Sequence, residues 1–307
     1  RIAERLSMFL KCATMPCMGK CGLCPVRCGA DRTRQAGACG AGADILLVKY
    51  GLHPYEEPCI SYKNGSGTVF FGGCALRCAF CQNYELSRAR CGREVSAKEL
   101  AAVFCELEER GAENINLVTA SHFVPQLLET FRIRRPKIPV VYNTHAYETL
   151  PALRALDRYI DVWLPDLKFF APALSARYTG RADYFAVASR AVAFMAERKP
   201  DLREGKMYAG CIVRHLILPL GTGDSLRIID WFAQLHSPAT FSLMAQYTPC
   251  GDAERFPELR RPITAREYER VRAHLEQSGI EHAFVQERAA ADGKFIPDFS
   301  EKNDALF

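Results

Sequence analysis

The sequence has no apolar run near the roughly 18 residues that a membrane-spanning helix needs. Its first residues do not follow the pattern of a signal peptide. An excess of one charge is also missing, because 40 Lys and Arg against 35 Asp and Glu give only +5, spread along 307 residues. This balance argues against nucleic acid or an anionic membrane as a partner. We therefore expect a cytoplasmic protein that binds neither.

Internal repeats, low-complexity tracts, a Gly-rich phosphate loop and a Ser/His/Asp arrangement are absent as well. The composition, 49% hydrophobic and 24% charged, is that of an ordinary globular protein and excludes disordered, collagen-like and coiled-coil chains. The length suggests about two domains, although an α/β barrel can use this much chain as one.

Cysteine, in contrast, is abundant. The chain has 14 cysteines, and most of them lie before residue 92. Disulfide frameworks are typical of short secreted chains, whereas clustered cysteines in a long chain more often bind metal or take part in redox chemistry. We expect the chemistry to reside in the N-terminal third.

From about residue 67, apolar β-branched runs alternate with amphipathic stretches, and two of these begin with the capping boxes Ser96-x-x-Glu99 and Thr264-x-x-Glu267. Such alternation predicts parallel strands joined by right-handed crossovers. Six βα units fit either a partial barrel or an open doubly wound sheet, and both collect ligands at the carboxyl ends of their strands. The predicted strands are 68–71, 114–119, 140–143, 160–167, 212–218 and 241–247, with a short run at 283–286; the predicted helices are 97–110, 123–134, 149–157, 183–199, 225–236 and 265–278.

Residues 1–62 differ from this pattern. They are rich in Cys, Gly, Pro and Arg and show little periodicity beyond a short apolar run at 45–48. We predict a loop-rich Cys module over 1–62, folded around something other than a hydrophobic core. The α/β core, with a C-terminal extension, then covers 63–307.

The sharpest motif is Cys74-x3-Cys78-x2-Cys81, placed between the first predicted strand and the first long helix. Three thiolates on one loop can hold three irons of a [4Fe–4S] cluster, which leaves the fourth iron open to a ligand. Zinc is the rival interpretation, with a fourth ligand such as a His from elsewhere.

This motif, with the aromatic Phe80 before its last cysteine and a βα series after it, resembles the radical S-adenosylmethionine (SAM) superfamily. The resemblance implies a partial (β/α)6 barrel, a [4Fe–4S] cluster and SAM. It also implies reductive cleavage of SAM to a 5′-deoxyadenosyl radical, which abstracts hydrogen from a substrate. An electron donor such as flavodoxin or ferredoxin is the implied partner.

Six segments, 56–61, 65–71, 78–84, 164–168, 214–216 and 246–249, resemble the branch related to pyruvate formate-lyase activating enzyme. That branch implies activation of a glycyl radical enzyme. The alternative hypothesis is modification of a small molecule or another peptide. The third hypothesis is a non-catalytic iron–sulfur or zinc protein.

The resemblance also implies roles for individual residues. Cys74, Cys78 and Cys81 would ligate the cluster, and Phe80 would lie beside the adenine. SAM carries charges of both signs, and Asp166 and Lys168 match an Asp-x-Lys pair that contacts them; the structural alternative is an ion pair at a strand end. Polar SAM contacts are further expected from Arg214, Asn143 and Thr144.

One segment departs from the family pattern. Relatives often carry Gly-Gly-Glu after the second strand to bind the SAM amino group, whereas this chain has Thr119-Ala120-Ser121-His122. Ser121 and backbone carbonyls can still accept from an ammonium. His122 is a substrate contact, a proton donor or a surface residue.

The N-terminal module offers four thiolates in Cys21-x2-Cys24-x3-Cys28-x10-Cys39. Four thiolates suit a closed zinc site or an auxiliary [4Fe–4S] cluster, and plain reduced thiols are the third reading. Other cysteines can substitute in this ligand set: Cys12, Cys17 and Cys59.

We interpret the remaining cysteines and histidines as residues with a structural role. We expect Cys105 and Cys211 to be core packing, and Cys250 either to be structural or to reach the active site. No metal spacing links the other histidines, which we expect to be surface or partly buried residues: His145, His236, His274 and His282.

Overall fold

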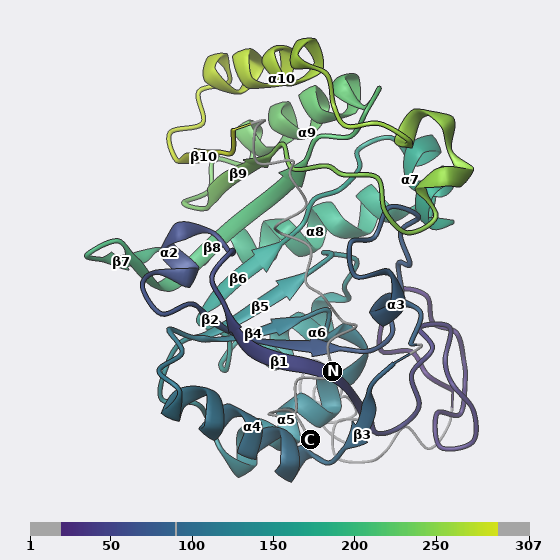
Figure 1. The fold of residues 1–307 in the computed structure, drawn as a ribbon, viewed down its shortest axis with the longest axis vertical. Helices are drawn as coiled ribbons and strands as arrows, with labels where there is room; N and C mark the ends of the chain where they lie inside the picture. Colours follow the sequence, from purple (N-terminus) through teal and green to yellow (C-terminus); the bar gives the residue numbers. More distant parts are fainter. Residues whose placement is uncertain (1–19, 90, 288–307) are drawn as a thin grey trace, which may run out of the picture.

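The structure, a computed structural model, describes residues 20–89 and 91–287. These residues form one ten-stranded open sheet with several helices (Figure 1). The strands are β1 (Ile45–His53), β2 (Ser66–Phe71), β3 (Arg93–Val95), β4 (Ile115–Val118), β5 (Val140–Thr144), β6 (Val162–Pro165), β7 (Asp201–Arg203), β8 (Lys206–Leu216), β9 (Thr240–Met244) and β10 (Ala283–Val285). The α-helices are α2 (Pro58–Ser61), α3 (Tyr84–Ser87), α4 (Ala97–Glu109), α5 (Val124–Ile133), α6 (Leu150–Leu156), α7 (Pro172–Thr179), α8 (Tyr184–Ala196), α9 (Thr222–Gln234) and α10 (Ala265–Gln277).

The order of the strands decides between the two predicted architectures. Strands β2, β4, β5, β6, β8, β9 and β10 lie side by side in chain order, and each is parallel to the next. A doubly wound sheet reverses its strand order at a switch point, whereas a barrel winds in one direction. The fold is therefore the partial, open (β/α)6 barrel.

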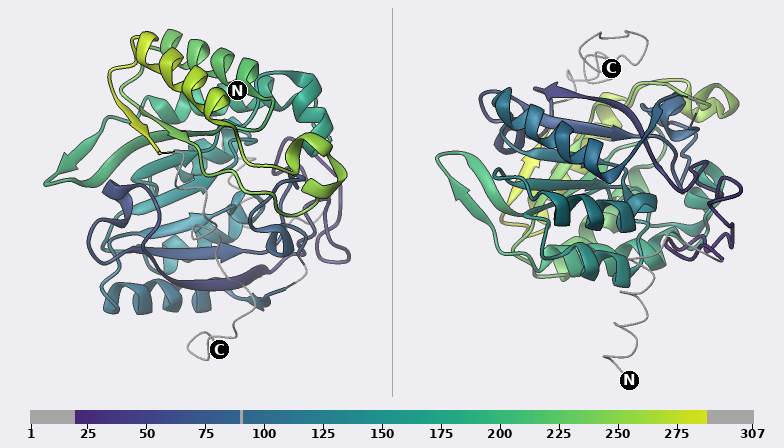
Figure 2. Two further views of the ribbon diagram at one scale, coloured as in Figure 1. Left: turned by 45° about the horizontal axis from the view of Figure 1, so that its top comes forward. Right: turned by 90° about the horizontal axis from the view of Figure 1, so that it is seen from below.

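The helices line one side of this sheet. Successive helices contact one another in the pairs α4–α5, α5–α6, α6–α8 and α9–α10, as expected when every crossover has the same hand. Figure 2 shows this row from two further directions. The opposite face of the sheet is left for the interior of the partial barrel. None of the described helices has the length and apolar character needed to cross a bilayer.

The six predicted strands and six predicted helices are confirmed, with ends that shift by a few residues, and the run at 283–286 forms β10. Both predicted capping boxes are present: the Ser96 and Thr264 side chains accept from the backbone N–H of Glu99 and Glu267. Each glutamate in turn accepts from the backbone N–H of its capping residue, which satisfies two free donors at each helix start.

Other elements were not predicted. β1 pairs antiparallel with β2 and β3 at the edge of the sheet, so the run at 45–48 belongs to a nine-residue strand. β8 begins six residues before the predicted 212 because β7 folds back on it through Glu204–Gly205, both with positive φ, as a two-residue hairpin turn requires. The division of the chain at residue 62 stays a prediction.

Candidate functional site

The loop that carries Cys74, Cys78 and Cys81 leaves the carboxyl end of β2 and is firmly anchored. The N–H of Ala79 donates to the carbonyl of Tyr178 at 2.9 Å, and the carbonyl of Ala79 accepts from the N–H of Asp252 at 2.7 Å. Contacts of this kind, from segments far along the chain, hold the three thiols at the mouth of the barrel. Cys74 and Cys78 are buried, and Cys81 is partly exposed.

The ammonium of Lys168 acts electrostatically on all three thiols. Burial raises the pKa of Cys74 to about 11 and also raises the pKa of Cys78 and Cys81, while the Lys168 ammonium lowers all three. The sequence-predicted cluster cysteines and Lys168 are thus brought together. Protonated thiols must lose their protons to bind metal, and a neighbouring cation favours that loss.

No three His, Cys, Asp or Glu side chains of residues 20–89 and 91–287 converge as ligands of one metal ion would. Cys74, Cys78 and Cys81 offer one thiolate to each of three irons of a [4Fe–4S] cluster. The zinc interpretation needs a fourth ligand as well.

Aromatic rings surround Phe80, which is buried next to the cysteine loop. Its ring centroid lies 5.9 Å from that of Phe169, 6.1 Å from Tyr178 and 6.2 Å from Tyr247, all in edge-to-face arrangements. The thiol of Cys250 donates to the Phe80 carbonyl at 3.3 Å, so Cys250 reaches this loop. These contacts make a rigid apolar wall beside the thiols.

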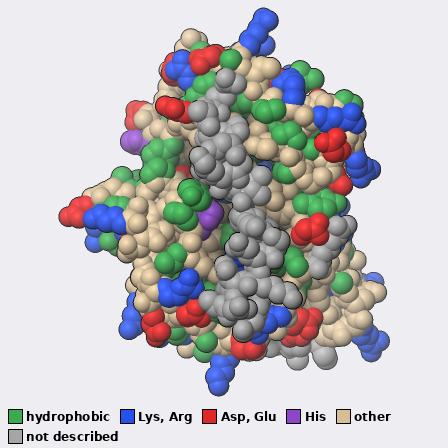
Figure 3. Space-filling view, viewed as in Figure 1, with side chains coloured by type: hydrophobic (Ala, Val, Ile, Leu, Met, Phe, Trp, Pro, Cys, Tyr) green, Lys and Arg blue, Asp and Glu red, His purple; other side chains and the backbone are tan. Residues whose placement is uncertain are grey.

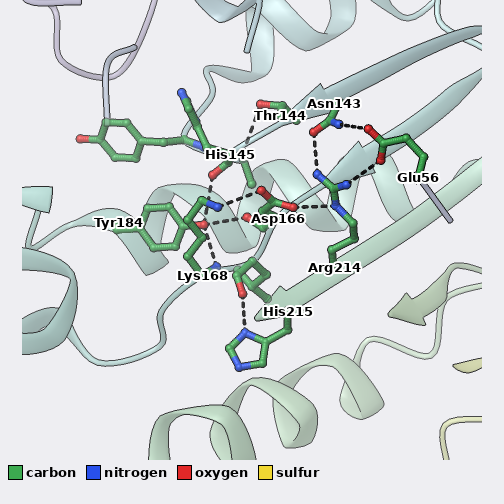
Figure 4. A network of polar contacts seen from close by, with 12 residues as sticks. Glu56, Asn143, Thr144, His145, Asp166, Lys168, Tyr184, Arg214 and His215 are labelled. Atoms are coloured by element: carbon green, nitrogen blue, oxygen red, sulfur yellow. Dashed lines mark hydrogen bonds and ion pairs between the residues drawn. The ribbon is translucent and has the colours of Figure 1, made fainter. Parts of the chain in front are cut away.

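A network of charges crosses the barrel interior beside this wall (Figure 4). Asp166, just after β6, accepts from Nζ of Lys168 at 2.8 Å and from Nε of Arg214, on β8, at 2.7 Å. The guanidinium of Arg214 also donates to Oδ1 of Asn143 at 2.6 Å and to Glu56 at 3.0 Å. The network therefore joins four of the predicted SAM contacts and adds Glu56.

Burial alone would raise the pKa of Asp166, but the cations of Arg214 and Lys168 lower it below its usual value. Burial raises the pKa of Glu57, which also lies by Arg214. Its Oε2 and the Oδ1 of Asn116 are buried without a hydrogen-bond partner in the described part of the chain. Orphaned acceptors of this kind are rare unless a ligand or water completes them.

A second buried group gathers around Glu148, a residue the sequence did not single out. Its Oε1 accepts from the hydroxyls of Ser121 at 2.6 Å, Thr144 at 2.6 Å and Tyr142 at 3.2 Å. Burial raises the pKa of Glu148, and those hydroxyls oppose it. Two of the predicted SAM contacts, Ser121 and Thr144, thus direct their hydroxyl protons to this carboxylate.

The buried histidines correct two expectations. His145 was expected to be a surface or partly buried residue, but it is fully buried near Lys168 and Asp166. Its Nε2 has no hydrogen-bond partner among the described residues. Burial lowers the pKa of His145 to about 4, Lys168 adds to this, and Asp166 opposes it. His122 is also buried, with Nε2 2.8 Å from the Gly72 carbonyl oxygen, which rules out the surface reading. The local sequence does not reveal the burial of His122 and His145. Each follows the end of a strand, where side chains are exposed as often as buried.

The N-terminal cysteines lie against the same mouth. Cys21, Cys24 and Cys39 are buried and Cys28 is exposed. The carbonyl of Cys39 accepts from the N–H of Cys74 at 3.0 Å, which brings this module to the cluster loop.

The other cysteines are placed more simply. Cys59 packs in a separate apolar cluster with Val141 and Val162, away from the N-terminal thiols. Cys211 lies in the core, as predicted, and Cys105 donates to the carbonyl of Ala101 within α4. Cys12 and Cys17 lie outside the described residues.

These features fit the cofactors that the sequence suggested. Three thiols lie beside one lysine, an aromatic wall adjoins them, and charges of both signs with orphaned acceptors lie at the carboxyl ends of the strands. The sequence itself matches the radical SAM superfamily over residues 68–207.

Residues 68–207 form a radical SAM domain.

Members of this superfamily use a [4Fe–4S] cluster and SAM as cofactors. The relative found among curated proteins is an uncharacterized protein of Methanocaldococcus jannaschii, 26% identical over 262 residues, which cover 82% of this chain and 72% of that protein.

Two solved structures are similar to part of this chain at low identity. SuiB of Streptococcus suis bound to S-adenosylmethionine gives a TM-score of 0.49 at 16% identity, over 70% of this chain and 48% of that one. A domain of pyruvate-formate lyase-activating enzyme from Bacteroides vulgatus gives 0.37 at 9% identity, over 53% of this chain and 89% of that domain. The chain thus spans about half the length of SuiB.

Proposed function

We propose that this chain is a radical SAM enzyme whose [4Fe–4S] cluster is held by Cys74, Cys78 and Cys81. The observation that carries the proposal is the loop of these three thiols after β2, which Tyr178 and Asp252 anchor at the mouth of the barrel. The ion pair of Lys168 and Asp166 lies at the same end of the sheet. Bound together, cluster and SAM supply a 5′-deoxyadenosyl radical that takes a hydrogen atom from a substrate.

The residues around the thiols bind and orient SAM in this proposal. Lys168 offers an ammonium to the SAM carboxylate, and Asp166 stays ionised because two cations lower its pKa. Arg214 holds Asp166 in place across the barrel interior, and Asn143 accepts from the same guanidinium. Phe80 supplies an apolar face for the adenine and, with its aromatic neighbours, keeps water from the site.

Glu148 fills the place left open by the missing Gly-Gly-Glu segment. It is a buried carboxylate, and no cationic side chain of the described residues pairs with it. A buried anion without a counterion is costly, and an ammonium would offset that cost. We infer that Glu148 accepts from the SAM amino group, with Ser121 and Thr144 fixing the carboxylate.

For the reaction as a whole, the implied substrate is a glycine in a glycyl radical enzyme, as for the activating enzymes this chain resembles. A small molecule or another peptide is the second candidate. It is favoured by the N-terminal module, where the Leu23 carbonyl accepts from the hydroxyl of Thr149 and Arg32 donates to the carbonyl of His122. These contacts place residues 20–42 over part of the mouth, which limits access for a large partner.

Reductive cleavage needs one electron, for which a flavodoxin or ferredoxin is the proposed donor. Clustered cysteines in a long chain are typical of metal-binding proteins in a reducing compartment, so we place the reaction in the cytoplasm. In the view of Figure 3, basic and acidic side chains are interspersed outside the grey residues, with no field of one sign to steer a polyanion.

The test is formation of 5′-deoxyadenosine from SAM by anaerobically reconstituted, reduced protein. We expect formation by the native chain and by Cys211→Ala, which removes a core thiol, and none by Cys78→Ala. Formation that survives in Cys78→Ala would refute the ligand assignment. Deuterium transfer into 5′-deoxyadenosine from a labelled protein or a labelled metabolite then separates the two substrate classes.

A further inference from the structure

The segment 20–42 carries four cysteines and almost no apolar core of its own. It is shaped by backbone hydrogen bonds: the N–H of Cys21 donates to Ala30 at 3.1 Å, and the N–H of Gly29 donates to the Cys21 carbonyl at 3.0 Å. Three of the four thiols are nevertheless buried. A loop that buries thiols without an apolar core around them is typical of a segment that folds around a metal centre.

The four thiols form one connected group. A Cβ placed on Gly37 would lie 3.4 Å from Sγ of Cys28 and 3.5 Å from Sγ of Cys39, so these two sulfurs are at most about 7 Å apart. Burial raises the pKa of Cys24 to about 11, and the thiols of Cys39 and Cys21 raise it further. The pKa of Cys39 is raised by burial and, in addition, by Cys21 and Cys28. Each thiol therefore lies near at least one other of the four.

The number of these thiols and their position favour an iron–sulfur centre. Four thiolates supply one ligand to each iron of a [4Fe–4S] cluster, and Cys39 lies against Cys74 on the loop of the first cluster. Zinc requires four sulfurs around one point, whereas a [4Fe–4S] cluster takes one sulfur on each of four irons. Four cysteines leave no iron open, so such a centre transfers electrons and does not bind SAM.

We propose that Cys21, Cys24, Cys28 and Cys39 hold a second [4Fe–4S] cluster that passes electrons to the cluster of the radical SAM domain. The carbonyl of Cys39 accepts from the N–H of Cys74 at 3.0 Å. A ligand of each cluster is thus joined to the other by one backbone hydrogen bond. Gly73 permits this approach, because a Cβ there would lie 2.7 Å from the Cys39 carbonyl oxygen.

Cys28 is the exposed member of the set, and it gives the second cluster an edge that faces an external donor. A reduced flavodoxin or ferredoxin gives one electron to the second cluster, which then gives one electron to the first and returns to its oxidised state. No bond forms or breaks in these two transfers. The relay role rests on the proposed function, whereas the metal site does not.

The metal site is tested by iron and sulfide analysis of the full chain after anaerobic reconstitution. We expect about eight irons per chain in the native protein and about four in Cys28→Ala, with about eight in the matched control Cys105→Ala. A triple variant, Cys74→Ala with Cys78→Ala and Cys81→Ala, should keep about four irons, with an electron paramagnetic resonance signal insensitive to SAM. Cys28 is exposed, so its substitution removes no buried side-chain packing.

Several results would overturn the site: about four irons in both the native chain and Cys28→Ala, no iron in the triple variant, or one zinc per chain in the module. The relay is tested by 5′-deoxyadenosine formation in Cys28→Ala. We expect at least a tenfold loss with reduced flavodoxin and little loss with dithionite, and equal losses with both would overturn it. A native chain with about eight irons and no 5′-deoxyadenosine would refute the proposed function and leave the site standing.

Discussion

Arg214 and Asp166 are paired across the interior of the partial barrel, with Nε of the guanidinium 2.7 Å from Oδ1 of the carboxylate. The same guanidinium reaches Glu56, 158 residues away in sequence, at 3.0 Å. One buried cation thus joins β8, the end of β6 and the segment before α2. This makes Arg214 important for stability as well as for the site.

Replacing Arg214 with Met should therefore destabilise the fold. The substitution removes the positive charge that pairs with the buried carboxylates of Asp166 and Glu56. Losing one partner of a buried ion pair costs about 3–5 kcal/mol of stability. Denaturant unfolding without SAM measures the loss. Arg203→Met, which breaks an exposed pair with Asp201, is the control and should cost less than about 1 kcal/mol. Similar losses in both variants would contradict this prediction.

Lys168→Met tests the SAM site. Removing the ammonium leaves Asp166 paired with Arg214, so the fold should be kept while the SAM affinity of cluster-loaded protein falls about tenfold or more. Equilibrium dialysis with reconstituted protein measures the dissociation constant. Lys206→Met removes a lysine that pairs with Glu113 instead, and it should leave SAM affinity unchanged. An unchanged affinity in Lys168→Met would remove Lys168 from the site.

Glu148→Gln separates charge from hydrogen bonding. The amide oxygen can still accept from Ser121 and Thr144, so stability should change little, but the charge that we assign to the SAM amino group is lost. We expect SAM affinity to fall about tenfold or more. Ser121→Ala keeps the carboxylate and should have the smaller effect. If the two variants bind SAM as tightly as the native chain, Glu148 is only a structural acceptor.

His215 predicts a dependence of stability on pH. Its ring is buried between the Leu167 carbonyl, 2.7 Å away, and the Ser225 hydroxyl, 2.9 Å away, and burial lowers its pKa to about 4. The unfolded chain binds a proton near pH 6.5, whereas the folded chain does not until about pH 4. The contribution of neutral His215 is therefore complete above pH 6.5 and falls by about 1.4 kcal/mol per pH unit below it.

Denaturant unfolding of the native chain and of His215→Gln between pH 7.5 and 4.5 measures this contribution. The difference in their free energies of unfolding should shrink as the pH falls below about 6.5. A difference that stays constant over this range would mean that His215 does not titrate differently in the two states.

The βα series and the cysteine loop could be predicted because both are local patterns. The strands and helices repeat with their own periods, and capping boxes such as Ser96-x-x-Glu99 use backbone groups three residues apart. Cys74, Cys78 and Cys81 lie within eight residues of one loop. In contrast, only residues 45–48 of β1 stood out and the β7–β8 hairpin was missed, since the rest of β1 and the three residues of β7 carry a weak periodic signal.

The sequence by itself determined which strands are parallel, where the cysteine loop begins and which cofactor chemistry the chain carries. Only the tertiary structure decided that Glu56 joins Arg214, that Glu148 gathers Ser121 and Thr144, and that Cys39 meets Cys74. These contacts join segments far apart in the chain. Their energy comes from burial of charge and from backbone hydrogen bonds that exist only once the barrel has assembled, so no local pattern records them.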